Sequence, residues 1–281
     1  MKIKIFIVTY KNEEYLKNNI LSLLNSDLVN CNYQINVINN FTGDFSIREF
    51  CKNNNIIVYD NYLRPDFSTG HLSRNWNQAI INGFKSIEEP DCDILVLCQN
   101  DNVFKQNWCE YIIEKHKIYD FISIGGGDQY HSYKVSHIKK VGLWDERFCN
   151  IGYQEADYFI RSFLYNGEKS SINDFNHKRI LNQLIEESIK TPSGIWGTNR
   201  IIDLDDSLKG GMRNDVYHIE SSKYHNISKN ILEQKWGLEF EGSWTQEKLN
   251  KLPKKSKIPN FIFYPYFEKN VENLQEKGYV V

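Results

Sequence analysis

The polar and apolar positions of the first hundred residues alternate between two patterns. Short apolar runs rich in β-branched residues predict strands, and apolar residues every three or four positions predict helices. The predicted strands are Ile3–Val8, Tyr33–Ile38, Ile56–Tyr59 and Ile94–Cys98. The predicted helices are Glu13–Leu24, Ser46–Asn53 and Leu72–Ile87. Such alternation is typical of an α/β protein with a doubly wound, mostly parallel, Rossmann-like sheet and right-handed crossovers.

The second half of the chain has a less regular pattern. Its predicted elements are helices at Trp108–His116 and Glu155–Tyr165, and strands at Phe121–Ile124, Val135–Val141 and Val216–Ile219. Residues 167–211, with one predicted helix at Ile180–Ile189, are interpreted as an insertion. We therefore expect one domain over residues 1–228, with halves 1–104 and 105–228. Residues 229–281 form a predicted C-terminal accessory segment, a helical extension with helices at Lys229–Trp236 and Phe267–Lys277.

Composition adds mainly exclusions to this picture. The chain has 281 residues, of which 41% are hydrophobic and 25% charged, as is ordinary for a soluble globular protein. The formal net charge of -2 gives no nucleic-acid signal. No apolar stretch is long enough to span a bilayer, and the N-terminal run is typical of a first strand, not of a signal peptide.

The cysteines and one basic stretch bear on localisation. Six cysteines without a CxxC pair indicate reduced thiols in a cytoplasm-like compartment, so we expect a cytoplasmic protein. The basic stretch Lys248–Lys257 is either a solvated linker or a weak contact of a peripheral protein with anionic lipid headgroups at the membrane face.

The most informative stretch follows the fourth predicted strand, where an apolar run breaks off into Gln99-Asn100-Asp101-Asn102. In parallel sheets, ligand sites form beyond the carboxyl ends of the strands. A carboxylate flanked by amides at that place suits a divalent cation that carries a diphosphate. A capped turn explains the same residues, because Asn and Asp also favour turns.

Polar residues follow the first two strands as well. Thr9 and Tyr10 end the first strand, and Asn12 either caps the next helix or shares that turn with a ligand. The amides of Asn39 and Asn40, which end the second strand, either recognise the edge of a nucleobase or form an Asx-rich turn.

Three further places carry candidate chemistry. Arg74 and Asn75 lie at the start of the third helix, where the helix N-terminus and a guanidinium favour a phosphate. Glu155 and Asp157 lie at another helix start, where the helix dipole stabilises carboxylates and where one of them could act as a general base. His218 follows a late apolar run and is either structural or a ligand of the metal-diphosphate site.

In this order, the motifs resemble those of the inverting, family-two glycosyltransferases of the GT-A fold. The resemblance covers roughly Lys2 to Ser222, and the order of the motifs carries it. The matched segments are Thr9-Tyr10-Lys11-Asn12, Asn39-Asn40, Gly70 to Asn75, Gln99-Asn100-Asp101, Gly142 to Phe148, Gln154 to Arg161, and His218 with Ser221.

The resemblance implies an enzyme of the EC 2.4 class. It would transfer a sugar with inversion from a nucleotide-diphosphate sugar, most simply UDP-linked, in polysaccharide or glycoconjugate synthesis. Asp101, with His218, would hold Mn²⁺ or Mg²⁺ on the donor diphosphate, and Glu155 and Asp157 would be the base and a second carboxylate. The remaining donor-binding residues would be Thr9, Tyr10, Asn12, Asn39, Asn40, Arg74, Asn75, Gln99, Asn100 and Arg161.

Two departures from the family pattern qualify this expectation. Gln99 stands where the first Asp of an Asp-x-Asp motif is usual, which predicts a weak or dispensable metal. Glu155 replaces the usual Asp, which lengthens the side chain by one methylene and keeps the carboxylate.

Two other functions fit part of the pattern. A sugar nucleotidyltransferase would share the sheet, but it usually carries a Gly-rich, basic loop after the first strand, where this chain has TYKNEE. A non-catalytic nucleotide- or carbohydrate-binding module is compatible with Gln99.

The acceptor, a carbohydrate, a lipid-linked sugar or another glycoconjugate, is not fixed by the sequence. The aromatic residues Tyr130, Tyr133, Trp144 and Tyr153 either stack a sugar ring or pack in the core. Residues 229–281 could form a dimer contact, dock a partner or cover the sheet.

Overall fold

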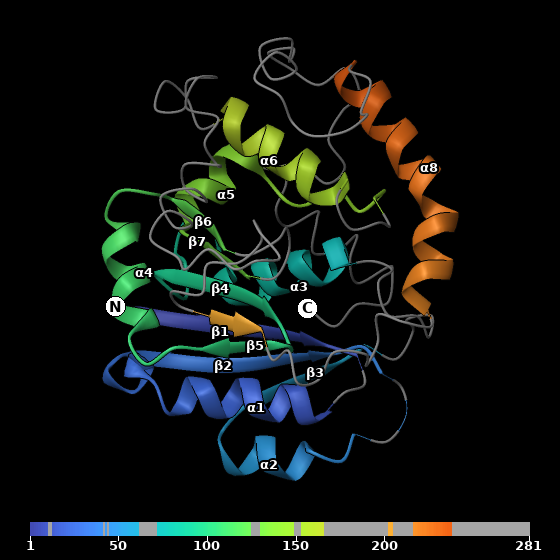
Figure 1. The fold of residues 1–281 in the computed structure, drawn as a ribbon. Coiled ribbons are helices and arrows are strands. Elements are labelled where there is room, and N and C mark those ends of the chain that lie inside the picture. Colours follow the sequence, from blue (N-terminus) through green and yellow to red (C-terminus); the bar gives the residue numbers. More distant parts are fainter. Residues whose placement is uncertain are drawn as a thin grey trace.

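The computed structural model describes residues 1–10, 13–41, 43, 45–61, 72–124, 130–148, 153–165, 202–204 and 216–237 (Figure 1). Of residues 124, 159, 163–165, 202–204 and 216–225 it describes the backbone only. The elements are β1 (Lys2–Thr9), α1 (Glu13–Leu24), η1 (Asp27–Asn30), β2 (Asn32–Asn39), α2 (Arg48–Asn53), β3 (Ile57–Asp60), α3 (Leu72–Phe84), β4 (Ile94–Gln99), β5 (Asn102–Phe104), α4 (Trp108–His116), β6 (Phe121–Ile124), β7 (Tyr130–Tyr133), α5 (Val135–Val141), α6 (Tyr153–Tyr165), β8 (Ile202–Leu204) and α8 (Val216–Trp236).

Six of these strands form one sheet in the order β3-β2-β1-β4-β7-β6. The four strands β3, β2, β1 and β4 are parallel, whereas β7 runs antiparallel to both β4 and β6. The predicted α/β class with a doubly wound, mostly parallel sheet is therefore confirmed. The remaining strands, β5 and β8, pair antiparallel in a separate two-stranded sheet.

Both faces of the sheet are buried, which explains why its central strands are continuous apolar runs. On β1, Ile3, Ile5 and Ile7 point into one core cluster with residues of α1 and α4. Phe6 and Val8 alternate with them and point into a second cluster with residues of α3, α5 and α6. The sheet is thus covered by α1, α2 and α4 on one face and by α3, α5 and α6 on the other (Figure 1).

Helix α3 packs closely on the sheet because of one glycine. A Cβ on Gly83 would lie 2.5 Å from Cδ1 of the buried Leu95 on β4. The helix ends at Phe84, three residues before the predicted end. Lys85 has a φ of 58°, and a left-handed residue ends the helical hydrogen-bond pattern.

Two predicted strands were wrong. Val135–Val141 is helix α5, in which His137, Ile138 and Val141 are buried with the spacing of one helix face. Val216–Ile219 is the first turn of α8, a 21-residue helix whose later buried residues, Ser228, Leu232 and Lys235, also follow a helical period. In both segments the β-branched residues favoured a strand locally, and the tertiary context overrode that preference.

Some expected features lie outside the described residues. These include the predicted helices at 180–189 and 267–277 and the basic stretch at 248–257. Helix α8 continues across the expected boundary between residues 228 and 229, where the accessory segment was predicted to begin. The division of the chain into domains stays a prediction. The five described cysteines are free thiols, and the Sγ atoms of Cys31 and Cys109 lie 3.5 Å apart.

Candidate functional site

Three neighbouring parallel strands bring predicted site residues to one edge of the sheet. Thr9 pairs in register with Asn39, and Val8 pairs with Gln99, so β1, β2 and β4 end side by side. Beyond β4, the side-chain amide of Asn100 donates a hydrogen bond of 3.0 Å to the Thr9 hydroxyl. The expected meeting of the polar strand ends is therefore present, with Thr9 and Asn100 both buried.

The side chain of Asn39 is fully engaged within its own turn. Its Nδ2 donates to Asp60 Oδ1 at 2.8 Å and to the Phe41 carbonyl at 3.1 Å, and its Oδ1 accepts from the Phe41 amide at 3.0 Å. The Asx turn that the sequence left open is thus formed. Tyr10, which is also buried, contacts the Phe41 ring edge-on with centroids 5.9 Å apart.

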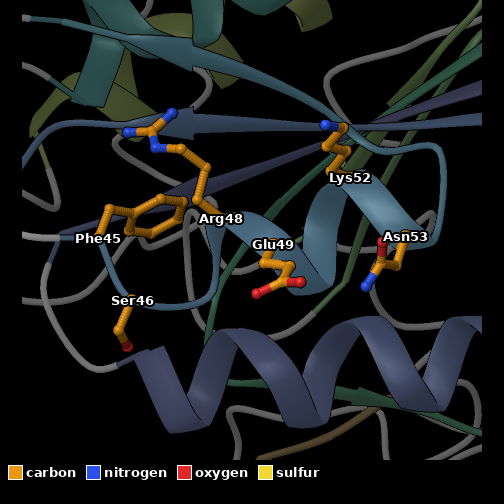
Figure 2. A pocket seen from close by; sticks show the side chains of 6 residues that line it. All are labelled: Phe45, Ser46, Arg48, Glu49, Lys52 and Asn53. Atoms are coloured by element: carbon orange, nitrogen blue, oxygen red, sulfur yellow. The ribbon is translucent and has the colours of Figure 1, made fainter.

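Asp60 links this turn to α2. Arg48 binds it with two parallel contacts, from Nη1 at 2.9 Å and from Nη2 at 3.1 Å. Arg48 also lines a shallow surface pocket together with Phe45 and Lys52 (Figure 2). The guanidinium lies 5.3 Å from the Phe45 ring centroid. Because its guanidinium binds the Asp60 carboxylate with both Nη atoms, Arg48 stabilises the end of β3.

A cluster of buried amides joins the ends of β2 and β3 to α3. Asn61 donates to Asn40 Oδ1 and to Gln78 Oε1, both at 2.9 Å, and to Asn75 Oδ1 at 3.4 Å. Gln78 returns a hydrogen bond to Asn61 at 3.0 Å. The Nδ2 atoms of Asn40 and Asn75 are buried and have no hydrogen-bond partner among the residues that the structure describes. Both therefore keep donor capacity for a ligand group.

Asn61 was missed by the sequence interpretation. It directly follows β3, as Asn40 follows β2, and its position at the carboxyl end of a parallel strand was the signal that could have found it.

The start of α3 is held by the segment before α6. Arg74 Nε lies 3.3 Å from Glu146 Oε2, and Asn77 Nδ2 donates to Glu146 Oε1 at 3.0 Å. Asn77 also exchanges two hydrogen bonds with the backbone of Trp144. The Arg74 side chain is 26% exposed, so part of it remains accessible to solvent.

Glu155 lies in the first turn of α6 and is connected to the start of α3. Ser73 Oγ donates to Gln154 Oε1 at 2.9 Å, and Gln154 Nε2 donates to Glu155 Oε1 at 2.7 Å. All three residues are buried. The carboxylate proposed as a base is thus oriented by an amide whose other end is fixed on the helix that carries Arg74 and Asn75.

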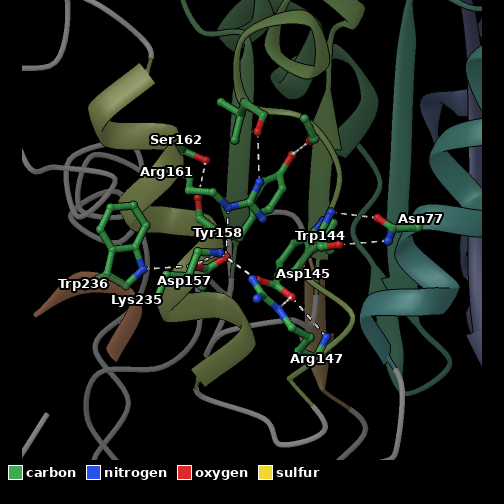
Figure 3. A network of polar contacts seen from close by, with 12 residues as sticks. Asn77, Trp144, Asp145, Arg147, Asp157, Tyr158, Arg161, Ser162, Lys235 and Trp236 are labelled. Atoms are coloured by element: carbon green, nitrogen blue, oxygen red, sulfur yellow. Dashed lines mark hydrogen bonds and ion pairs between the residues drawn. The ribbon is translucent and has the colours of Figure 1, made fainter. Parts of the chain in front are cut away.

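Asp157 belongs to a buried ionic network (Figure 3). Its Oδ2 accepts from Arg161 Nε at 2.9 Å. Its Oδ1 lies 2.7 Å from Lys235 Nζ and accepts from Trp236 Nε1 at 2.9 Å. Arg161 thus supports the Asp157 carboxylate. Because both oxygens of Asp157 already accept from protein donors, its place in the described structure is that of an anchor.

Asp145 is the second carboxylate of this network. It binds Lys235 Nζ at 2.7 Å and Arg147 Nε at 2.8 Å. Burial opposes ionisation of Asp145, but the hydrogen bonds and charges of Arg147 and Lys235 outweigh it and hold the pKa of this carboxyl well below its usual range.

The expected metal ligands are only partly placed. Asp101 lies in the turn between β4 and β5 and is half-buried. No group of three or more His, Cys, Asp or Glu side chains close enough to hold a metal occurs among the described residues. The described part of the chain does not include the side chain of His218, nor the residues Asn12, Gly70 and His71.

The aromatic residues considered for sugar stacking pack in the core. Tyr130, Tyr133 and Trp144 are fully buried. Trp144 stacks on Tyr158 with centroids 4.1 Å apart and donates to the Tyr133 hydroxyl at 3.1 Å. Stacking of a sugar on these three rings was therefore the wrong alternative.

Among the described helices, none is long and apolar enough to cross a bilayer.

Comparison with known proteins gives only distant likenesses. No family model matches the sequence, and no curated protein matches it. The crystal structure of TarS from S. aureus aligns with a TM-score of 0.44 and 13% identity over 59% of this chain and 34% of that chain. TarS 1-349 in complex with UDP aligns with a TM-score of 0.43 and 13% identity, over 58% of this chain and 55% of that one.

A third solved structure is the mannosyltransferase PcManGT from Pyrobaculum calidifontis in complex with GDP-Man and Mn²⁺. It aligns with a TM-score of 0.44 and 7% identity, and the alignment covers 58% of this chain and 52% of the mannosyltransferase chain. The chain thus spans between a third and little more than half of the structures to which it is similar.

Proposed function

We propose that this chain is a glycosyltransferase of the EC 2.4 class. It moves a sugar from a nucleotide-diphosphate sugar, UDP-linked in the simplest case, to an acceptor hydroxyl with inversion. One observation carries the proposal. The polar ends of β1, β2 and β4 meet at one edge of the sheet, and a buried hydrogen-bond chain, Ser73–Gln154–Glu155, connects a carboxylate to the helix that starts at this edge.

In this proposal the donor lies across the strand ends. Thr9, Tyr10, Asn12 and Asn40 surround the nucleoside, and Asn39 shapes the turn beside it. Asn61 orients the Asn40 amide, whose Nδ2 has no partner among the described residues and is a donor for a carbonyl of the base. Arg74, whose side chain is partly exposed, provides a guanidinium for the diphosphate.

Glu155 is the general base in this proposal. Its carboxylate takes the proton of the acceptor hydroxyl as the hydroxyl oxygen attacks the anomeric carbon of the donor. The bond from that carbon to the diphosphate breaks on the opposite side, so the configuration inverts and the nucleoside diphosphate leaves. Gln154 keeps the reacting carboxylate in one orientation through its hydrogen bond of 2.7 Å to Oε1.

A divalent cation fits this arrangement only as a partner of the donor. Gln99 and Asn100 contribute no charge, and Asp101 is the carboxylate at this strand end, with His218 as the proposed further ligand. Mg²⁺ and Mn²⁺ bind through one or two carboxylates when substrate phosphates and water complete the shell, and the residues present fit that case. When bound, the cation would offset charge on the diphosphate.

A donor panel tests the proposal against its alternatives. The full chain is incubated with UDP- and GDP-linked sugars, with and without Mn²⁺, and release of nucleotide is measured. A transferase releases nucleoside diphosphate slowly by hydrolysis and faster with an acceptor. Release of pyrophosphate from a nucleoside triphosphate and a sugar phosphate would establish a sugar nucleotidyltransferase instead. Binding of nucleotide without any turnover would establish a binding module.

A further inference from the structure

Lys235 occupies a fully buried position near the end of α8. Its Nζ atom lies 2.7 Å from Asp145 Oδ2 and 2.7 Å from Asp157 Oδ1. Figure 3 shows the three side chains together. The next residue, Trp236, is also buried and donates to Asp157 Oδ1 at 2.9 Å. Consecutive residues of α8 therefore contact two segments, around Asp145 and Asp157, that precede α8 by many residues in the sequence.

These two segments support opposite sides of the proposed site. Asp157 lies on α6, two residues after Glu155. Asp145 directly precedes Glu146, which contacts Arg74 and Asn77 on α3. One ammonium group thus ties the helix of the proposed base to the segment that anchors the donor side.

Arg161 cannot replace this bridge. It contacts Asp157 from the same helix, four residues later, so it fixes the Asp157 carboxylate within α6. Its hydrogen bond from Nη1 to the Val141 carbonyl at 2.9 Å joins α6 to the end of α5 and not to Asp145. The link between the two carboxylates is made by Lys235.

We propose that Lys235 is a positioning residue for Glu155, acting through Asp157 and Asp145. The inference rests on the proposed transferase function, because it assigns Lys235 a part in the same reaction. Buried ion pairs contribute little net stability compared with an apolar replacement, whereas they fix geometry when both partners are charged. A displacement of the reacting groups by about 1 Å lowers a rate by about 10²-fold.

The test replaces Lys235 by Met, which fills a similar volume without the ammonium. The matched control is Lys229→Met on the same helix, where the lysine is 25% exposed and pairs with Glu233 at 3.8 Å. We expect Lys235→Met to lower kcat by about 10²-fold while KM for the donor changes by less than about threefold, since the donor contacts stay in place. Lys229→Met should change both by no more than about twofold.

A double-variant cycle separates positioning from a general structural effect. If Lys235 acts through Glu155, then adding Lys235→Met to Glu155→Gln lowers the residual rate no further. If Lys235→Met lowers kcat by the same factor in the wild-type and in the Glu155→Gln background, the proposal is overturned. An unchanged kcat in Lys235→Met would also overturn it.

A second variant covers the case in which Lys235→Met fails to fold. Combining Lys235→Met with Asp145→Asn removes the bridge and leaves Asp157 paired with Arg161, so no carboxylate loses all its partners. The same loss of kcat is expected, and wild-type kcat in this folded variant would contradict the proposal. A wild-type chain that transfers no sugar from any donor contradicts the proposed function itself, whereas an active wild type with an equally active Lys235→Met contradicts only the role of Lys235.

Discussion

Glu155 accepts a hydrogen bond from a neutral amide donor. Gln154 Nε2 lies 2.7 Å from its Oε1, and Gln154 is in turn held by Ser73. A hydrogen bond from this uncharged donor fixes the direction of the carboxylate.

Removing the charge of Glu155 should lower the rate of sugar transfer and leave the binding of nucleotide unchanged. We expect Glu155→Gln to lower kcat by about 10² to 10⁴-fold, the range typical of a lost general base. Affinity for the free nucleoside diphosphate, measured by calorimetry, should stay unchanged because the strand ends that would bind it are untouched. Glu155→Asp is the control, since it keeps the carboxylate and should retain part of the rate. Full activity in Glu155→Gln would contradict the assignment of the base.

At the residue scale, the sequence predicted the positions of the strand-end residues better than their partners. The strand-end residues Thr9 and Asn100 meet as expected, because the ends of parallel strands are set by the fold class. The engagement of Asn39 by Phe41 and Asp60 depends on the shape of one turn, which residue types alone do not fix. Lys235 carried no signal in the sequence, because its carboxylate partners lie about 80 and 90 residues away.

At the scale of elements, the sequence predicted several helices and strands with the bounds that the structure has. The bounds of α1, α4 and β6 agree with the sequence prediction. Strand β7 was missed because Tyr130-His131-Ser132-Tyr133 contains no aliphatic residue. Its burial comes from pairing with β4 and from rings such as Trp144, which stacks on His131 with centroids 5.1 Å apart. Such context is tertiary and leaves no local pattern.

Helix α4 is capped by a residue from another part of the chain. Asp27 of η1 accepts from the backbone amides of Cys109 at 3.0 Å and Glu110 at 2.7 Å. The N-cap residue of α4 itself, Asn107, makes no side-chain cap. We expect Asp27→Ala to lower the free energy of unfolding by about 1 to 2 kcal/mol, because two helix amides lose their acceptor. Urea denaturation measures this loss, and Asp27→Asn, which keeps one acceptor oxygen, should lose less.

Two buried histidines make the packing of α4 and α5 sensitive to acid. Burial lowers the pKa of His116 to about 4 and that of His137 to about 3, from an ordinary 6.5. The unfolded chain binds these protons first, so their contribution to stability is present above pH 6.5 and is lost as the pH falls through the folded values.

Chemical denaturation between pH 7 and pH 4 tests this dependence. We expect a loss on the order of 3 kcal/mol per histidine over the full range. His137→Phe, which can keep the stacking on Phe121, should remove its share of the slope. A free energy of unfolding that stays flat between pH 6.5 and pH 4 would contradict the burial of neutral imidazoles.

At the scale of the whole molecule, the sheet order explains where a site can lie. Strands β1, β2 and β4 are adjacent and parallel, and α3 and α6 start near their carboxyl ends through the contacts of Asn61 and Ser73. The sequence predicted the mostly parallel, doubly wound sheet because alternating strands and helices allow few topologies. It did not predict α8 as a partner of α6, because the packing of one helix against another depends on surfaces that only the folded sheet creates.

The two outer strands of the described six-stranded sheet have a consequence for self-association. Both β3 and β6 are four residues long. Short edges offer few unpaired backbone groups to a second chain, which limits strand-to-strand aggregation. Asp60, at the end of β3, adds a charged residue that Arg48 already neutralises. If two copies associate, their interface should therefore consist of side-chain surfaces on the helices and not of a sheet that continues from one copy into the next.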